Sequence, residues 1–253
     1  MEVRAKKALG QHFLTDQKAA RAIVDALAGP GDTLEIGPGM GVLTQYLLQR
    51  EDINLKMVEL DGESVEYLLT HFPGMQGRLI QADFLKLHLE KFFPGSFSII
   101  GNFPYNISSQ IFFKVLDYKD SVPEVVCMVQ KEVAERIAEP PGTKTYGILS
   151  VFLQAWYDIE YLFTVGPGAF APPPKVQSAV IRLRRNGRTD LGCDEALFRK
   201  IVKASFGLRR KTLRNSLKPL VTETSILQDP VFDLRPERLD VEDFVELTLK
   251  LSR

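Results

Sequence analysis

Cysteine and histidine are scarce in this chain, which has two of the first and three of the second among its 253 residues. Cys127 and Cys193 lie far apart in sequence, so we expect two unpaired thiols, as is typical of proteins from a reducing cytoplasm. No cysteine lies near a histidine in sequence, so no zinc or other metal site is expected.

Long apolar runs are absent too. No stretch reaches the roughly 18 uninterrupted apolar residues of a membrane span, and the first residues lack the apolar core of a secretory signal. The length and the 45% hydrophobic content suit one large α/β domain, alone or with a small second domain. We therefore expect a cytoplasmic protein without a membrane partner.

A net charge is also missing, because 32 basic residues balance 32 acidic ones, yet the charges are unevenly distributed. Between Lys175 and Lys218, thirteen lysines and arginines outnumber three acidic residues. This basic segment between acidic flanks indicates either an anionic partner such as a nucleic acid or only a solvated helix face.

What the chain does contain is an alternation of strand-like and helical patterns over its first 184 residues. Apolar runs predict strands at 33–36, 55–60, 78–81, 97–101, 125–129, 160–165 and 178–184. Helical spacing predicts helices at 42–50, 63–71, 131–138 and, with Ser108 as N-cap, 108–118. Such alternation implies an α/β fold with a parallel sheet covered by helices on both faces.

A polar, turn-rich segment at 185–192 indicates a linker. Beyond it only helices are predicted, at 195–206, 210–220 and 241–251, the last with Asp240 as N-cap. We therefore expect two domains, an α/β domain of residues 1–186 and a small helical domain of residues 187–253.

Three glycines, Gly37, Gly39 and Gly41, join the first predicted strand to a helix. Their spacing departs from the dinucleotide fingerprint Gly-x-Gly-x-x-Gly, because Val42 occupies its last position. The tighter spacing favours a cofactor without a pyrophosphate, such as S-adenosylmethionine, over a generic glycine-rich turn.

Acidic residues end the next two predicted strands. Glu59 is expected to accept hydrogen bonds from both ribose hydroxyls of the cofactor, and Asp83 from its adenine amine. Their neighbours Leu60 and Phe84 belong to the same predicted site. Ordinary caps at strand–helix junctions are the alternative for both acids, and Asp61 is expected to be exposed or a helix cap.

The tetrad Asn102-Phe103-Pro104-Tyr105 follows the fourth predicted strand. An amide oxygen, backbone carbonyls and an aromatic ring at the carboxyl end of a strand can hold a planar base that carries an exocyclic amine. The tetrad therefore indicates chemistry on an adenine N6 or a cytosine N4. An Asn-Pro-type turn with a packed tyrosine is the alternative.

Six motifs together resemble the KsgA-type rRNA adenine N6,N6-dimethyltransferases, whose wider family includes the Erm methyltransferases. The motifs occur in family order at residues 10–14, 35–44, 59 with 83, 102–105, 170–178 and 206–215. Two departures are mild: Phe103 stands where the family has Leu, and His12 stands where Asn is common. The resemblance covers nearly the whole chain.

The resemblance implies a Rossmann-like, seven-stranded methyltransferase sheet with a small helical domain, and S-adenosylmethionine as cofactor. It adds Gln11, His12 and Leu14 to the cofactor-binding residues. The implied substrate is a pair of adjacent adenosines in the loop of the 3′-terminal hairpin of 16S rRNA, within the immature 30S subunit. Each would receive two methyl groups at N6 from a monomeric enzyme with a part in subunit biogenesis.

For catalysis, we expect Asn102 and a backbone carbonyl near Pro104 to accept the amine hydrogens of a flipped adenine. Tyr105 would stack on one face of the base and Phe170 on the other. Core packing is the alternative for both rings.

Seven basic residues are predicted to contact rRNA phosphates. They are Lys6, Lys7, Lys175, Arg209, Arg210, Lys211 and Arg214. The last four lie within one and a half helical turns at the start of the predicted helix, on which Arg210 and Arg214 share a face. A solvated basic face is again the alternative.

Three other functions compete with this interpretation: a ribosome-assembly factor whose binding matters more than its catalysis, an Erm-type enzyme for large-subunit rRNA, and a DNA adenine methyltransferase. The intact glycine motif and tetrad argue against the first. The basic C-terminal helix argues against the second. The third usually has Asp/Asn-Pro-Pro-Tyr in place of the tetrad found here.

Overall fold

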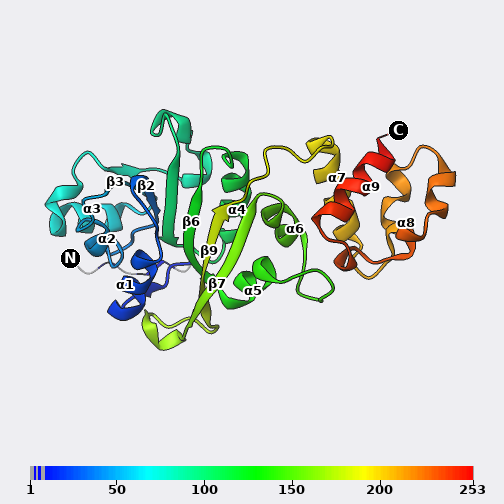
Figure 1. The fold of residues 1–253 in the computed structure, drawn as a ribbon. Coiled ribbons are helices and arrows are strands. Elements are labelled where there is room, and N and C mark those ends of the chain that lie inside the picture. The colour runs from blue at the N-terminus through cyan, green and yellow to red at the C-terminus, as the bar shows by residue number, and fades with distance from the viewer. Residues whose placement is uncertain (1–2, 4, 7–8, 253) are drawn as a thin grey trace. The chain divides into compact units, whose positions relative to one another are not determined.

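The computed structural model describes residue 3, residues 5–6 and residues 9–252 (Figure 1). The chain divides into two compact units. The first comprises the described residues up to Ala134 together with Ile159–Arg185, and the second comprises Glu135–Asp158 and the residues from Asn186 onward.

The first unit is built on a seven-stranded sheet with the order β4-β3-β2-β5-β6-β9-β7 (Figure 1). Its strands are β2 (Gly31–Ile36), β3 (Ile53–Glu59), β4 (Leu79–Gln81), β5 (Phe97–Asn102), β6 (Glu124–Gln130), β7 (Tyr157–Val165) and β9 (Ser178–Arg185). β2 pairs in parallel with both β3 and β5. The strand order therefore reverses between β2 and β5, and the carboxyl ends of two such strands flank the crevice where open α/β sheets bind ligands.

β9 is the exception to the predicted parallel sheet. It runs antiparallel to β6, with Cys127 opposite Ile181. The connection from β7 to β9 contains no α-helix, which a parallel crossover would normally require. The seven predicted strands are all present, but the prediction of a parallel sheet is wrong for β9.

Both faces of the central strands are buried. α1 (Gln17–Asp25), α2 (Thr44–Leu47) and α3 (Gly62–His71) contribute to a core cluster on one face, together with Ile100 of β5. The preceding residue Ile99 is also fully buried. Because successive side chains of a strand point to opposite faces, the sheet is covered on both sides, as predicted.

The N-cap of α4 (Ser108–Asp117) and the length of α2 differ from the prediction. α4 has Ile107 rather than Ser108 as its N-cap. α2 is only the middle of the longer helix predicted there, with turns on either side. α5 (Lys131–Ala138), in contrast, has the predicted bounds.

Two short strands were not predicted. β1 (Phe13–Leu14) pairs antiparallel with β8 (Phe170–Ala171). Both strands are too short to show the period-2 pattern that identifies a strand in sequence. Their pairing joins the segment before α1 to the loop between β7 and β9. These two segments lie far apart along the chain.

The second unit is helical. It contains α6 (Ile148–Gln154), α7 (Glu195–Gly207), α8 (Leu213–Leu217), α9 (Val241–Leu251) and several short 3₁₀ segments. α7 contacts the other three helices. α6 was not predicted, and the unit includes residues 135–158 as well as the C-terminal helices, so the domain boundary at residue 186 stays a prediction.

The N-terminus of α9 is capped by a side chain. Asp240 caps α9 as predicted, because its carboxylate accepts a hydrogen bond from the Asp243 N–H at 2.8 Å. None of the helices in the described part of the chain is both long enough and apolar enough to span a bilayer.

The predicted basic helix at 210–220 is much shorter than expected. α8 begins only at Leu213, so Arg210 and Lys211 lie in the turn that precedes it. The Lys211 N–H closes this turn on the Leu208 carbonyl at 2.7 Å. The prediction that Arg210 and Arg214 share a helix face is therefore wrong.

A buried carboxyl group links β2 to α2. Glu35 is 1% exposed and accepts a hydrogen bond from the Thr44 hydroxyl at 2.7 Å. Burial raises the pKa of Glu35 to about 8, although the bond from Thr44 opposes the rise, and the charge of Glu59 adds to it. At neutral pH, Glu35 is therefore mainly protonated in the folded protein and ionised in the unfolded chain.

This raised pKa predicts a pH-dependent stability. Between pH 4.5, the ordinary pKa of the group, and about pH 8, its pKa in the folded protein, the folded state keeps a proton that the unfolded chain releases. The contribution of Glu35 to the free energy of unfolding is therefore complete below pH 4.5 and is lost as the pH rises toward 8. Glu35→Gln keeps an acceptor for Thr44 and cannot ionise. Relative to the unchanged protein, its free energy of unfolding should rise by about 3 kcal/mol between pH 5 and pH 7.5, measured by urea denaturation. Parallel pH profiles for the two proteins would contradict this prediction.

Candidate active site

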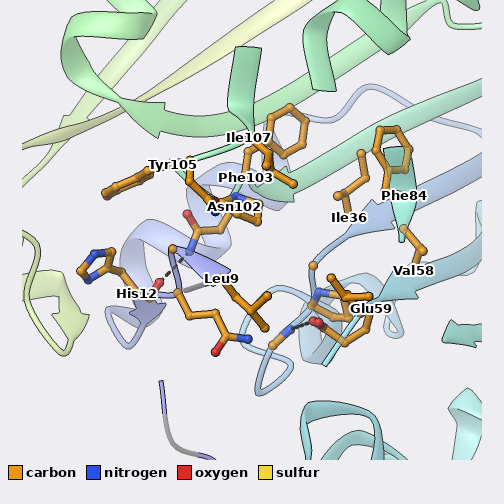
Figure 2. Close-up of a pocket in the computed structure, with 18 of the residues that line it drawn as sticks. Leu9, His12, Ile36, Val58, Glu59, Phe84, Asn102, Phe103, Tyr105 and Ile107 are labelled. Carbon is orange, nitrogen blue, oxygen red and sulfur yellow. Dashed lines mark hydrogen bonds between the residues drawn. The ribbon is translucent and has the colours of Figure 1, made fainter. Parts of the chain in front are cut away.

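A pocket opens at the carboxyl ends of β2 and β5 (Figure 2). Its walls come from residues 9–14, the glycine turn after β2, the end of β3, the 3₁₀ turn after β4 and the tetrad after β5. The predicted site residues that line it are Gln11, His12, Leu14, Gly37, Gly39, Glu59, Leu60, Asp83, Phe84, Asn102, Pro104 and Tyr105. The fold thus brings most of the predicted site together, and only Gly41 and Phe170 are not among the lining residues.

The glycine turn shapes one wall of the pocket. Gly37 and Gly39 have φ values of +65° and +57°, which residues with side chains rarely adopt. Gly41 also has a positive φ, but a Cβ atom there would lie 2.5 Å from the Phe72 ring. Gly41 is therefore required for packing against the end of α3 rather than for contact with a ligand.

Glu59 lies at the end of β3 and is 6% exposed. One carboxylate oxygen accepts from the Gly39 N–H at 3.1 Å and the other from the Asp61 N–H at 2.9 Å. Burial raises the pKa of Glu59, while these backbone donors act in the opposite direction. Each oxygen keeps a further lone pair, so the carboxylate can still accept from a pair of ligand hydroxyls.

Asp83 and Phe84 form the wall beside Glu59. Asp83 caps the 3₁₀ turn by accepting from the Leu85 N–H at 3.0 Å. Phe84 is 5% exposed and lines the pocket with an apolar ring. Leu60 lines it too, with 51% of its surface exposed.

Lys114 supports this wall and was missed in the sequence. Its ammonium lies 5.2 Å from the centre of the Phe84 ring and donates to the carbonyls of Leu85, at 3.1 Å, and Leu87. Burial lowers the pKa of Lys114, against the pull of nearby acids including Asp83. The only signal in the sequence is a lysine within the apolar run of α4, which does not by itself reveal its partners.

Asn102 lies at the centre of the pocket, with its carboxamide fixed at one end. Its Nδ2 donates to the His12 carbonyl at 3.0 Å, drawn as a dashed line in Figure 2. Its Oδ1 is buried and has no hydrogen-bond partner among the residues that the structure describes. Rotating the amide by half a turn would place two oxygens against each other, so the His12 carbonyl determines that the unpaired end is the acceptor.

Tyr105 is fixed beside Asn102 by its hydroxyl, which is hydrogen-bonded to the Ser178 hydroxyl. Burial raises the pKa of this phenol, and the bond to Ser178 opposes the rise. Phe170, the predicted partner for the other face of a base, is only 4% exposed and belongs to the core cluster. The prediction that Phe170 lines the site is not met, because its strand β8 pairs with β1 and turns the ring into the core.

The N-terminal segment is held by Asp61, which was expected to be exposed or a helix cap. It is 4% exposed and is the N-cap residue of α3. Its carboxylate accepts from the Lys6 ammonium and, at 3.5 Å, from the Gln11 amide. Burial raises the pKa of Asp61, but the donors, led by Lys6, outweigh it and leave a lowered pKa. Lys6 also pairs with Glu63 at 3.0 Å, so it is committed to acidic groups in this structure.

Some of the predicted RNA-binding residues are bonded to other parts of the protein, and others are exposed. Arg209 donates to the carbonyls of Lys144 and, at 2.8 Å, Tyr146, whereas Arg214 pairs with Asp233 at 2.6 Å. Both therefore have structural partners. Lys175, Arg210 and Lys211 are exposed, and Lys7 lies outside the described residues.

The two cysteines are free thiols, as predicted, with Cys127 buried and Cys193 partly exposed. Burial raises the pKa of both thiols. Within the part of the chain that the structure describes, no three His, Cys, Asp or Glu side chains are grouped to hold a metal ion.

Comparison with known sequences gives one matching family and relatives that share one name. The family described as Ribosomal RNA adenine dimethylase matches residues 2–233. A protein from Parabacteroides distasonis named Ribosomal RNA small subunit methyltransferase A is 62% identical, over 98% of this chain and 94% of its own. A protein of the same name from Cytophaga hutchinsonii is 58% identical, over 99% of this chain and 98% of its own.

Comparison with solved structures supports the fold. A dimethyladenosine transferase from Plasmodium falciparum matches with a TM-score of 0.80 and 23% identity, over 95% of this chain and 98% of that one. The 23S rRNA methyltransferase ErmE matches with a TM-score of 0.68 and 24% identity, over 95% and 100%. At these identities the structural likeness establishes the Rossmann-like α/β methyltransferase fold. The family match over most of the chain shows that this protein belongs to the ribosomal RNA adenine dimethylase family of methyltransferases.

Proposed function

We propose that this protein uses S-adenosylmethionine to dimethylate N6 of two adjacent adenosines in the loop of the 3′-terminal hairpin of 16S rRNA. It would act in the cytoplasm, as a monomer, on the immature 30S subunit. The family match and the relatives named for the small ribosomal subunit support this substrate class.

The observation that carries the proposal is the Oδ1 of Asn102, for which the described part of the chain offers no hydrogen-bond donor. A buried acceptor without a partner is unfavourable, by about 1–3 kcal/mol, and therefore calls for a donor from outside the chain. The N6 amine of adenine is such a donor. Its hydrogens can bond to this oxygen and to backbone carbonyls of the tetrad.

The pocket residues also fit the cofactor. Glu59 keeps two acceptor positions for ribose hydroxyls, and Asp83 can accept from an adenine amine. At Gly37 a Cβ atom would meet nothing closer than 4.0 Å, so the glycine turn leaves the backbone open to close approach there. Bound S-adenosylmethionine would supply an electrophilic methyl group.

The residues of the chain then act on the substrate amine. Its lone pair is delocalised into the adenine ring, so bonds from its hydrogens to Asn102 and a carbonyl near Pro104 favour the tetrahedral geometry in which the lone pair is available. These fixed dipoles also stabilise the positive charge that develops on N6. Tyr105, held by Ser178, provides a ring on which the flipped base stacks.

The second unit would supply rRNA contacts, within the predicted helical domain of residues 187–253. Arg210 and Lys211 are exposed, and the described residues include no hydrogen bond or ion pair for either side chain. Arg209 and Arg214, which are engaged with carbonyl and acidic groups, would instead hold the surrounding turn in place.

The competing functions are separated by one experiment. The protein is incubated with labelled cofactor and immature 30S particles, 50S particles or duplex DNA, and the modified base and its methyl count are mapped. Two methyl groups on each of two adjacent 16S adenosines would support the proposal. Modification of 50S rRNA or DNA, or binding to 30S particles without methyl transfer, would contradict it.

Asn102→Ala removes both the acceptor for the amine and the bond to His12. We expect kcat to fall by about 100-fold or more, comparable to loss of a fixed polar group from other transition-state sites. Cofactor affinity, measured by calorimetry, should change much less. Asn54→Ala, at an exposed asparagine bonded to Asp32, is the control and should be fully active. Near-normal transfer by Asn102→Ala with intact cofactor binding would rule out this role.

Replacing Arg210 and Lys211 together by glutamine should weaken binding to 30S particles and reduce the slope of log affinity against log salt by about 1.5, since two phosphate contacts are lost. The control with the same charge change is Lys18→Gln with Lys91→Gln, at two exposed lysines of the first unit. Equal salt slopes for the two double variants would show that Arg210 and Lys211 form only a solvated face.

A further inference from the structure

Lys114 of α4 lies behind one wall of the pocket. Its ammonium is 5.2 Å from the centre of the Phe84 ring and donates to the carbonyls of Leu85, at 3.1 Å, and Leu87. Phe84 is 5% exposed and lines the pocket on the same side as Glu59 (Figure 2). Lys114 is not among the lining residues, so it can act on the pocket only through the turn that it contacts.

This wall is a single 3₁₀ turn, Phe84–Lys86, capped by Asp83. The Leu85 N–H donates to the Asp83 carboxylate at 3.0 Å, and the Leu87 N–H donates to the first carbonyl of the turn at 3.2 Å. Short 3₁₀ turns have poorer hydrogen-bond geometry than α-helices and few bonds of their own. The position of the wall therefore depends on contacts from outside the turn, and Lys114 supplies two hydrogen bonds of this kind.

The helix that carries Lys114 is also bonded to the tetrad. The Ser108 hydroxyl donates to the Tyr105 carbonyl at 3.3 Å, and the Ile107 N–H donates to the Pro104 carbonyl at 3.2 Å. Lys114 lies near the other end of the same helix. α4 therefore links the tetrad at its N-terminus to the Phe84 wall through one ammonium group.

Further groups hold the Lys114 ammonium in place. It lies 6.0 Å from the centre of the Tyr118 ring, and the Tyr118 hydroxyl donates to Glu90 at 2.5 Å. The charges of Asp83, Glu90 and Asp117 favour the protonated form of the amine. The cation is thus fixed by a ring and by acidic groups on both the helix and the wall.

Lys114 also borders a groove outside the pocket, with a volume of about 540 Å³. Leu85 lines both the groove and the pocket. Lys114 is only half-buried, so replacing its ammonium by an apolar group would leave no sealed cavity in the core. We therefore expect variants of Lys114 to fold.

We propose that Lys114 is a positioning residue for the cofactor, because it holds Asp83 and Phe84 where the adenine of S-adenosylmethionine binds. The inference rests on the proposed function. Lys114 does not touch the cofactor and acts through the turn, whose carboxylate accepts from the adenine amine and whose ring lies against the base. The glycine turn and Asn102 belong to other segments, so the geometry of methyl transfer depends little on Lys114.

The test measures calorimetric binding of S-adenosylhomocysteine and steady-state methyl transfer to immature 30S particles. Lys114→Met keeps the apolar stem and removes the cation and its donors, whereas Lys114→Arg keeps both. Lys114→Gln, which is neutral, takes the place of the Met variant should that variant not fold. The matched control is Lys56→Met. The Lys56 ammonium donates to the Phe92 carbonyl at 2.6 Å and lies 4.8 Å from the centre of the Phe93 ring, which does not line the pocket.

Lys114→Met should weaken binding of S-adenosylhomocysteine by about tenfold and raise KM for S-adenosylmethionine by a similar factor, because a wall that is no longer held loses its preorganisation. At saturating cofactor, kcat should stay within about twofold of the unchanged protein, as for loss of uniform binding. Lys114→Arg should bind within about threefold of the unchanged protein. Lys56→Met should lower the urea midpoint of unfolding about as much as Lys114→Met but leave cofactor affinity unchanged.

Four results would overturn this assignment. Unchanged cofactor affinity in Lys114→Met would leave the residue without a part in binding, and an equal loss in Lys56→Met would trace the effect to reduced stability. An equal loss in Lys114→Arg would show that the cation and its donors do not hold the wall. A fall in kcat with unchanged KM for S-adenosylmethionine would assign Lys114 to the transfer step. If the unchanged protein bound S-adenosylhomocysteine but failed to methylate 30S particles, the proposed function would fail, while calorimetry would still decide the role of Lys114.

Discussion

The hydrogen bond from the Asn102 amide to the His12 carbonyl is the interaction on which the pocket depends. A carboxamide has a donor end and an acceptor end, so committing Nδ2 to a carbonyl leaves Oδ1 as the group that faces a ligand. The bond requires β5 to end beside β2 and the N-terminal segment to cross the same edge. Sheet order and the short β1–β8 pair provide these two conditions.

Three acidic side chains around the glycine turn are stabilised in three different ways. Glu35 is held protonated by burial, Glu59 accepts from two backbone N–H groups, and Asp61 is paired with Lys6. Only Glu59 lines the pocket and keeps free acceptor positions. The pairing of Asp61 with Lys6 also couples the N-terminal segment to the same wall of the pocket, because the Asp61 N–H donates to Glu59.

Much of the first unit could be predicted because its strands are long and apolar enough to show a pattern. β6 is buried along almost its whole length and was recognised from its apolar run. The β1–β8 pair and α6 were not predicted, because these segments are too short to show a clear hydrophobic pattern. The basic residues after α7 were predicted as part of a helix from their spacing and from the resemblance. In the structure they form a turn, which the Lys211 N–H closes on the Leu208 carbonyl.

The sequence by itself determined the chemistry available at the site: a glycine turn, acids at strand ends and an amide with an aromatic ring, each recognisable from residue type and spacing. The tertiary structure decided which of these residues face one another. Phe170 was assigned to the base by motif, yet strand pairing buries it, while the same pairing leaves His12 beside Tyr105. Arg209 and Arg214 likewise have partners distant in sequence. Such contacts depend on how separate segments pair and turn, which local spacing does not encode.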